Sequence, residues 1–145
     1  MEKTPSQILN EAADLLTEEG LWNKGYFFKP AQTSKGCSMC AHGAIAYCGN
    51  RELREEVSGA SSEHVISGAN HKAGQGAFQD AQNAVSPYGG THLAARIKDN
   101  NLGLAHYAAM KAGLTIVFND AHGTTKEQVI QKLRTAAIET DRSAM

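Results

Sequence analysis

The chain has 145 residues, which is enough for one domain with a substantial hydrophobic core. Hydrophobic residues make up 41% and charged residues 20%, so the composition excludes a disordered chain, and no apolar run reaches the roughly 20 residues of a membrane span. The formal net charge of −1, without a basic stripe interleaved with aromatic residues, argues against a nucleic-acid-binding protein.

The cysteines and the N-terminal residues indicate the cellular compartment in which the protein is expected. Cys37, Cys40 and Cys48 lie close together, and the opening Met-Glu-Lys-Thr-Pro has none of the apolar residues typical of a secretory signal. An odd number of cysteines without a signal predicts free thiols in a reducing cytosol. We therefore expect a cytoplasmic protein.

A first helix is predicted over residues 5–19. Thr4 is a suitable N-cap, Pro5 suits the first helical position, and Gln7 completes a capping box with Thr4. Gly20 is a natural end for the helix, because glycine tolerates a left-handed cap. One face of this helix is apolar and is formed by Ile8, Ala12, Leu15 and Leu16.

A short strand or hairpin arm is predicted within the aromatic stretch 21–29, which contains an Asn-Lys-Gly turn signal. A second helix follows, with Ser38 or a neighbour as its cap and Gly49 at its end. Gly43 inside this helix costs about 1 kcal/mol relative to alanine, so we expect another backbone to approach closely there.

Residues 58–90 are rich in glycine and poor in apolar side chains. Before them, Asn50 is predicted to cap a short charged helix over 51–57. Within them, weak helical patterns occur near 61–67 and 76–85. A long glycine-rich section in a small domain is often functional or mobile, so we expect either a lid or an insertion.

The next part of the chain mixes helical and strand signals. Thr91 is predicted to cap a helix that is interrupted at Asn100, and a helical pattern resumes over 104–111. The β-branched apolar run 114–118 has the length of a strand, so a strand is predicted there.

The last helix is clear. Thr124 is predicted to cap it with Glu127 three residues on, and the tail from Thr140 is expected to fray. Its apolar face is formed by Val129, Ile130, Leu133, Ala136 and Ala137.

These elements predict an α+β fold that is mostly α, in a single domain spanning residues 1–145. We expect about five or six helices and a small β-hairpin or short sheet, built from residues near 21–29 and 114–118. The first and last helices should form much of the core.

Two clusters of residues carry a resemblance to a family. The first is Trp22 and Gly25 with Cys40-Ala41-His42-Gly43-Ala44-Ile45, and the second is Phe118-Asn119-Asp120 before the last helix. They resemble the pattern Trp-x-x-Gly, Cys-x-x-Gly-Ala-(Leu/Ile) and Trp-Asn-Asp of an uncharacterised family of small proteins of actinobacteria and their phages, with Phe118 in place of a tryptophan. The resemblance covers about half the chain, and it implies a bacterial or phage source but no activity.

Cys40 is the candidate nucleophile of one functional hypothesis. A cysteine in the first turn of a helix can have a lowered pKa, because the helix dipole favours the thiolate. His106 or His122 could act as the base, and Asn119 or Asp120 could orient it. The alternative is that Cys40 is a buried structural residue in a helix of small residues.

Metal binding is the weaker of the chemical hypotheses. Cys37, Cys40, His42 and Cys48 nearly supply four zinc ligands, but a second Cys-x-x-Cys or histidine pair is missing. Residues 40 and 42 of one helix also point in different directions. We therefore predict no metal and no cofactor.

A ligand pocket is the other hypothesis for these residues. Polar groups after an apolar strand can line a pocket, although they also commonly cap the next turn. No P-loop or dinucleotide fingerprint occurs, yet helix N-termini near Ser38 and Thr91, with His71, Lys72 and His92, could hold an anion. The predicted ligand-binding residues are Trp22, Tyr26, His42, Asn119, Asp120 and His122.

The sequence thus favours a non-enzymatic binding protein of bacterial or phage origin. We expect it to sequester a small anionic molecule, such as a nucleotide signal, or to bind a host protein, with no nucleic-acid or membrane partner. Self-association is compatible with its small-residue helices. The alternative is a thiol hydrolase or transferase centred on Cys40, with His106, Asn119 and Asp120.

Overall fold

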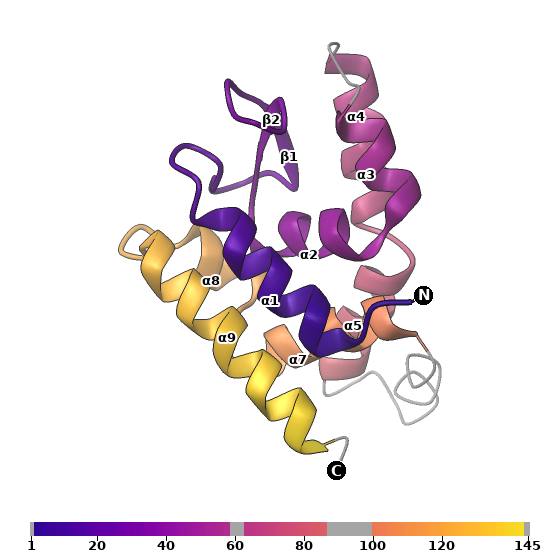
Figure 1. Ribbon diagram of the computed structural model, residues 1–145, viewed down its shortest axis with the longest axis vertical. Coiled ribbons are helices and arrows are strands. Elements are labelled where there is room, and N and C mark those ends of the chain that lie inside the picture. Colours follow the sequence, from indigo (N-terminus) through magenta and orange to yellow (C-terminus); the bar gives the residue numbers. More distant parts are fainter. Residues whose placement is uncertain (1, 59–62, 87–99, 144–145) are drawn as a thin grey trace.

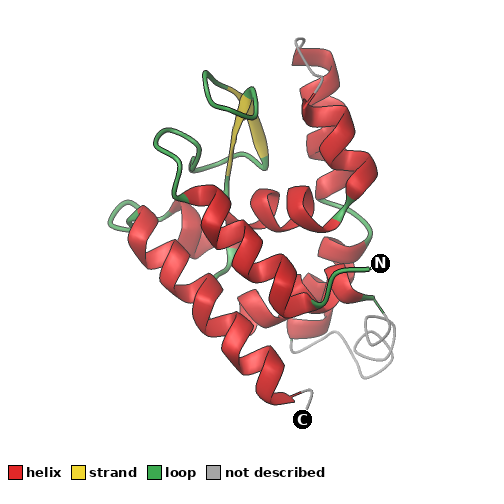
Figure 2. Ribbon diagram, viewed as in Figure 1, coloured by secondary structure: helices red, strands yellow, loops and turns green. Residues whose placement is uncertain are grey.

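The computed structural model describes residues 2–58, 63–86 and 100–143. These residues form eight helices, against the five or six expected, and one two-stranded antiparallel sheet (Figures 1 and 2). The fold is mostly α with a small hairpin, as predicted. The elements are α1 (Pro5–Leu16), β1 (Phe28–Pro30), β2 (Cys37–Met39), α2 (Ala41–Gly49), α3 (Arg51–Ser58), α4 (Glu63–Ala73), α5 (Ala77–Val85), α7 (Asn101–Lys111), α8 (Ile116–Asp120) and α9 (Lys126–Ser143).

The start of α1 confirms the predicted capping box. The Thr4 side chain accepts a hydrogen bond from Gln7 N, and the Gln7 side chain accepts one from Thr4 N. The helix ends at Leu16 rather than at residue 19, because the Thr17 hydroxyl bonds back to the Asp14 carbonyl and the chain turns there. This is a local side-chain bond that competes with helix continuation.

The sheet is a small hairpin. β1 pairs with β2 in antiparallel register, with Phe28 opposite Met39 and Pro30 opposite Cys37. Regular strand structure covers less of the aromatic stretch than predicted, and Trp22 forms only an isolated bridge to Met39. The residues before β1 instead bond to the segment around α8.

α2 lies in the middle of the molecule, against α1 and α7 (Figure 1). Its N-cap is Cys40 rather than Ser38, because Ser38 belongs to β2. The expected close approach at Gly43 is present: a Cβ there would lie 2.1 Å from the Phe27 carbonyl oxygen. Glycine is therefore required where the hairpin crosses α2.

α3, α4 and α5 agree with the predicted helical pieces in place, and α4 extends further than expected. The Asn50 side chain caps α3 by accepting from Leu53 N, as predicted. α3 and α4 lie side by side (Figure 1), with an ion pair between Lys72 and Glu56. The predicted cap Thr91 lies outside the described residues.

The strand predicted over 114–118 is wrong. Thr115 caps a short helix, α8, by accepting from Phe118 N at 3.1 Å. Val117 in the middle of the run is 80% exposed, which a buried strand would not allow. The apolar residues of the run therefore point to different sides of a short helix. Within the described residues the hairpin of β1 and β2 is the only sheet.

α9 completes the core from the other end of the chain. Its capping pair is Thr125 with Gln128, one residue later than predicted, because the Thr124 hydroxyl donates to the Phe118 carbonyl. The helix continues through Ser143, so the expected fraying from Thr140 is not observed.

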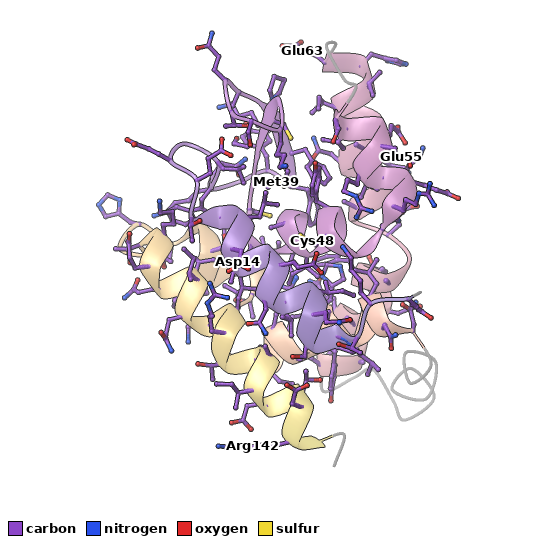
Figure 3. The ribbon with its side chains drawn as sticks, in the orientation of Figure 1. Asp14, Met39, Cys48, Glu55, Glu63 and Arg142 are labelled. Atoms are coloured by element: carbon purple, nitrogen blue, oxygen red, sulfur yellow. The ribbon has the colours of Figure 1, made fainter. Side chains whose placement is uncertain are left out.

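α1 and α9 run antiparallel along each other (Figure 1), as contacts at both ends show. Arg134 of α9 reaches Asp14, labelled on α1 in Figure 3, at 2.6 Å, and Ser6 bonds to Asp141. The predicted apolar faces of both helices are buried or packed against the core, which confirms that these helices form much of it. No helix of the described residues has the length and apolar character needed to cross a membrane.

Candidate functional site

Asn119 joins three segments that are far apart in the sequence. Its side-chain oxygen accepts from the indole nitrogen of Trp22 at 2.9 Å and from the backbone nitrogen of Ala41 at 3.0 Å. Its amide nitrogen donates to the Asn23 carbonyl and to Asp120 Oδ1. The Asn119 side chain is fully buried. The two clusters of the sequence therefore meet here, and we call these five residues the Asn119 network.

The loop around Gly25 is held by the same segment. Asp120 Oδ1 accepts from Gly25 N at 2.8 Å, where the glycine has a φ of +100°. Lys24 donates to the Ala121 carbonyl at 2.6 Å and its ammonium lies 5.6 Å from the Trp22 ring. The side-chain oxygens and nitrogen of Asn119 and Asp120 that were predicted to bind a ligand thus bond to other groups of the protein. The Trp-x-x-Gly segment and the Asn-Asp pair are thus hydrogen-bonded to each other and hold the two loops together.

His42 and His106 form a second buried cluster, which we call the histidine pair. Their Nδ1 atoms lie 2.9 Å apart and their rings stack, with centroids 5.1 Å apart. His42 Nε2 lies 2.7 Å from the Leu114 carbonyl oxygen. A carbonyl only accepts, so Nε2 of His42 carries a proton, and in the neutral pair His106 Nδ1 donates to His42 Nδ1. This pair joins α2, α7 and the turn before α8.

Phe78 of α5 closes the histidine pair from a third side. Its ring meets His42 at 5.3 Å and His106 at 5.4 Å, both edge to face. Burial lowers the pKa of His42 to about 4, with the Leu114 carbonyl opposing the shift, and burial together with His42 lowers the pKa of His106 well below its usual range. Both rings are therefore neutral near pH 7.

Cys40 does not have the surroundings of a thiolate. It is 2% exposed, and burial raises the pKa of its thiol to about 12 although Gly43 N donates to its sulfur at 3.4 Å. The carboxylate of Asp120 raises the pKa further. Its predicted base, His106, has its Nδ1 bonded to His42 rather than to sulfur. The arrangement favours a structural N-cap over a nucleophile.

The remaining cysteines are also buried thiols. Cys37, Cys40 and Cys48 are free, and burial raises the pKa of Cys37 to about 11 and that of Cys48 to about 12. Among the residues that the structure describes, no group of three or more histidine, cysteine or acidic side chains is placed to hold a metal ion.

The side chains of the other two predicted ligand residues are exposed, although the Tyr26 nitrogen bonds to the Asn23 side chain of the Asn119 network. Tyr26 is 52% exposed, with the Lys29 ammonium 5.3 Å from its ring. His122 is exposed after α8, and its carbonyl accepts from Lys24. The six predicted residues thus divide between the Asn119 network, the histidine pair and the surface.

A pocket of about 500 Å³ lies elsewhere, between the end of α2 and the beginnings of α3 and α7. The apolar part of its lining includes Ile8, Gly49 and Leu102, and a Cβ on Gly49 would lie 2.7 Å from Leu102 Cδ1. Its polar lining consists of Glu2, Lys3, Asn50, Arg51, Glu52, Arg54, Asn100 and Asn101, with the thiol residue Cys48 also at the wall.

Two cations of this pocket are fixed at the end of α2. Lys3 Nζ donates to the Cys48 carbonyl at 2.8 Å, and Arg54 donates to the Tyr47 and Cys48 carbonyls. Asn50 and Asn100 cap α3 and α7. Sequence reasoning missed this pocket, although each asparagine stands directly before a helix; nothing in the sequence shows that the two helix starts adjoin.

The comparisons with known proteins agree with the expectation of an uncharacterised family. A model for a "Family of unknown function (DUF6197)" matches residues 1–139. No curated protein and no solved structure matches the chain. The match covers the glycine-rich middle of the chain as well as both ends, and the chain therefore belongs to the DUF6197 family.

Proposed function

We propose that this protein is a non-enzymatic binding protein, which holds a small anionic molecule of about nucleotide size in the pocket between α2, α3 and α7. The observation that carries the proposal is that three cationic side chains, Lys3, Arg51 and Arg54, line one pocket together with apolar residues. A volume of about 500 Å³ is within the usual range for small-molecule sites.

The charged lining of the pocket contains three cations and two acids, Glu2 and Glu52. Lys3 also pairs with Glu11 at 3.1 Å and Arg51 with Glu55 at 3.0 Å, so an anion would bind by replacing these surface ion pairs. The first turns of α3 and α7 line the same pocket. Asn50 and Asn100 accept from Leu53 N and Gly103 N, and the amides of the two residues before each of these have no partner within their own helix. The apolar residues of the lining suit the base or another flat part of a ligand, while its cations suit a phosphate or carboxylate.

A binding role without catalysis is supported by the state of the chemically reactive groups. Cys40, His42, His106 and Asn119 are buried and bond to one another or to the backbone. Among the described residues, every buried side-chain nitrogen and oxygen has a hydrogen-bond partner. A substrate would have to break these contacts to reach any of them.

The test is a thermal-shift and calorimetric titration with AMP, ADP, cyclic AMP, pyrophosphate and inorganic phosphate. We expect at least one nucleotide to raise the melting temperature and to bind in a salt-dependent way. Arg51→Gln removes a charge from the rim at a side chain that otherwise pairs with the exposed Glu55, so it should weaken binding without unfolding the protein. Failure of every probe to bind at millimolar concentration would contradict the proposal.

Arg142→Gln is the matched control. Arg142 lies at the far end of α9 (Figure 3) and pairs with Glu139 in the same exposed manner. It removes one positive charge without touching the pocket, so binding should be unchanged. Equal weakening by both variants would assign the effect to net charge rather than to the pocket.

The thiol-enzyme alternative has its own test. Iodoacetamide at neutral pH should leave Cys40 unmodified in the folded protein, because the thiol is buried and protonated. Rapid alkylation that a bound ligand prevents would instead favour the hydrolase or transferase. Mass spectrometry of proteolytic peptides shows whether Cys40, Cys37 or Cys48 has been alkylated.

The bacterial or phage source, a cytoplasmic location and a host-protein partner belong to the same proposal. Three free cysteines suit a reducing compartment. Self-association is a further part of it and can be measured by ultracentrifugation with and without the nucleotide.

A further inference from the structure

We propose that the histidine pair is an acid-sensitive lock that holds α5 on α2 and α7, and that acid releases α5 before the rest of the fold. The pair is independent of the proposed anion pocket, since neither histidine lines that pocket. The lock can therefore operate whether or not an anion binds between α2, α3 and α7.

The first step is the number of protons that the pair can hold. Nitrogen atoms 2.9 Å apart share one proton, and His42 Nε2 already gives its proton to the Leu114 carbonyl. A proton added to His42 Nδ1 would place two N–H groups against each other. A proton added to His106 would leave a charge on a ring that is 1% exposed. Either addition opposes the closed arrangement.

Within the described residues, no neighbouring charge compensates for such a proton. The thiol of Cys40 precedes α2, and α2 and α7 also contain Tyr47, Cys48 and Tyr107. The charged residues of α5 and α7 are Asp80 and Lys111. The lowered pKa values of the pair come from burial, from each other and from the Leu114 carbonyl, with no contribution from these side chains. Asp120 of α8 acts on Cys40 instead.

The second step is the way in which α5 is attached. Its buried residues are Phe78 and Ala81, and Phe78 contacts both histidine rings and Phe27. The helix follows Gly76, which has a φ of +57° and open space around its Cα. A helix with few buried side chains can open locally while the core stays folded. Movement of the histidine rings removes two of the ring contacts of Phe78 and leaves those with Phe27 and with the cluster around Met110.

Hydrogen exchange followed by mass spectrometry tests the lock at pH 7.5 and pH 5.0, with rates corrected for the chemical effect of pH. An opened histidine has a pKa near 6.5, so opening at pH 5 is favoured by about 30-fold for each histidine that takes up a proton. We expect α5 to exchange about 30-fold to 1,000-fold faster, while α1 and α9 change little. Equal acceleration of α1 and α5 would overturn the proposal, because it would show global unfolding.

His106→Gln is the decisive variant, because glutamine does not titrate and still offers an N–H to His42. It should reduce the acid acceleration of α5 by about 30-fold. His71→Gln, at an exposed position of α4, is the control and should leave the acceleration unchanged. An acid response of α5 that is the same in all three proteins would contradict the lock.

A measurement on the unmodified chain covers the case in which His106→Gln does not fold. NMR of the imidazole rings should show that His42 and His106 stay neutral until α5 opens. Protonation of His42 and His106 without a change in α5 would overturn the proposal.

Discussion

Two consecutive residues of α2, Ala41 and His42, belong to two different polar clusters. The backbone nitrogen of Ala41 bonds to the Asn119 network, and the ring of His42 bonds to the histidine pair. Both clusters tie α2 to segments more than 60 residues away in the sequence. The first uses an amide that does not titrate, whereas the second uses two rings that do.

Buried polar groups therefore contribute to this fold in two ways. Three of the four bonds of the Asn119 side chain join it to groups that do not titrate, namely the Trp22 indole, the Ala41 nitrogen and the Asn23 carbonyl, so these bonds fix geometry independently of pH. The histidine pair fixes geometry only while it is neutral. The same end of α2 is thus held by one contact that is insensitive to acid and by another that acid breaks.

The largest effect is expected for Asn119→Ala. The substitution leaves the Trp22 indole, the Ala41 nitrogen and the Asn23 carbonyl without their buried partner. We expect the free energy of unfolding to fall by about 4 kcal/mol in urea denaturation. The exposed Gln131→Ala, at which a weak bond to Thr135 is lost, should change it by less than about 0.5 kcal/mol. Similar small losses in both variants would show that the network does not stabilise the fold.

Gly43→Ala should disturb both clusters together. Its Cβ would lie 2.1 Å from the Phe27 carbonyl, so the first turn of α2 and the hairpin must separate. We expect a loss of about 3 kcal/mol, with changes in both Trp22 fluorescence and the His42 NMR signals. Gly123→Ala, which has open space around it, is the control. A Gly43 variant with wild-type stability would contradict the close approach.

Acid should weaken the fold through the histidine pair. The folded pKa values of His42 and His106 are lowered, so the unfolded chain binds more protons as the pH falls below about 6.5. A histidine that stays neutral in the fold costs about 2 kcal/mol of stability at pH 5, and almost nothing above about pH 7.5. Urea denaturation at several pH values measures the slope, and His106→Gln should remove about half of the histidine contribution.

The smallest effect is expected for Trp22→Phe. It removes one donor, but the Asn119 oxygen keeps its bond from Ala41 N, so no acceptor is left alone. We expect a loss of about 1 kcal/mol in urea denaturation followed by circular dichroism. Tyr26→Phe, at a ring that is 52% exposed, should leave stability unchanged. A larger loss for Tyr26→Phe than for Trp22→Phe would reverse the proposed importance of the two rings.

Local signals in the sequence predicted the elements whose ends are fixed by their own side chains. The Thr4–Gln7 capping box and the Asn50 cap each involve residues three apart, so the sequence contains the complete interaction. The run 114–118 failed as a strand because a short apolar run fits either structure, and the Thr115 cap decided for a helix.

The candidate site was predictable only in part. The meeting of Trp22, Asn119 and the start of α2 was expected, but their complete internal satisfaction was not. His42 and His106 were singled out for separate roles, since no spacing shows that rings 64 residues apart are in contact. The pocket near Lys3 depends on the packing of three helix ends, which is a tertiary property.

The pairing of α1 with α9 also bears on how the chain is made. The inner face of α1 includes Leu9 and Ala12, and α9 covers this helix with residues that come more than 110 positions later. α1 leaves the ribosome well before α9 has been synthesised. The apolar face of α1 therefore has no α9 to pack against during translation. Pairing between segments so far apart in the sequence is slow to form, so this face of α1 stays open to other contacts during synthesis.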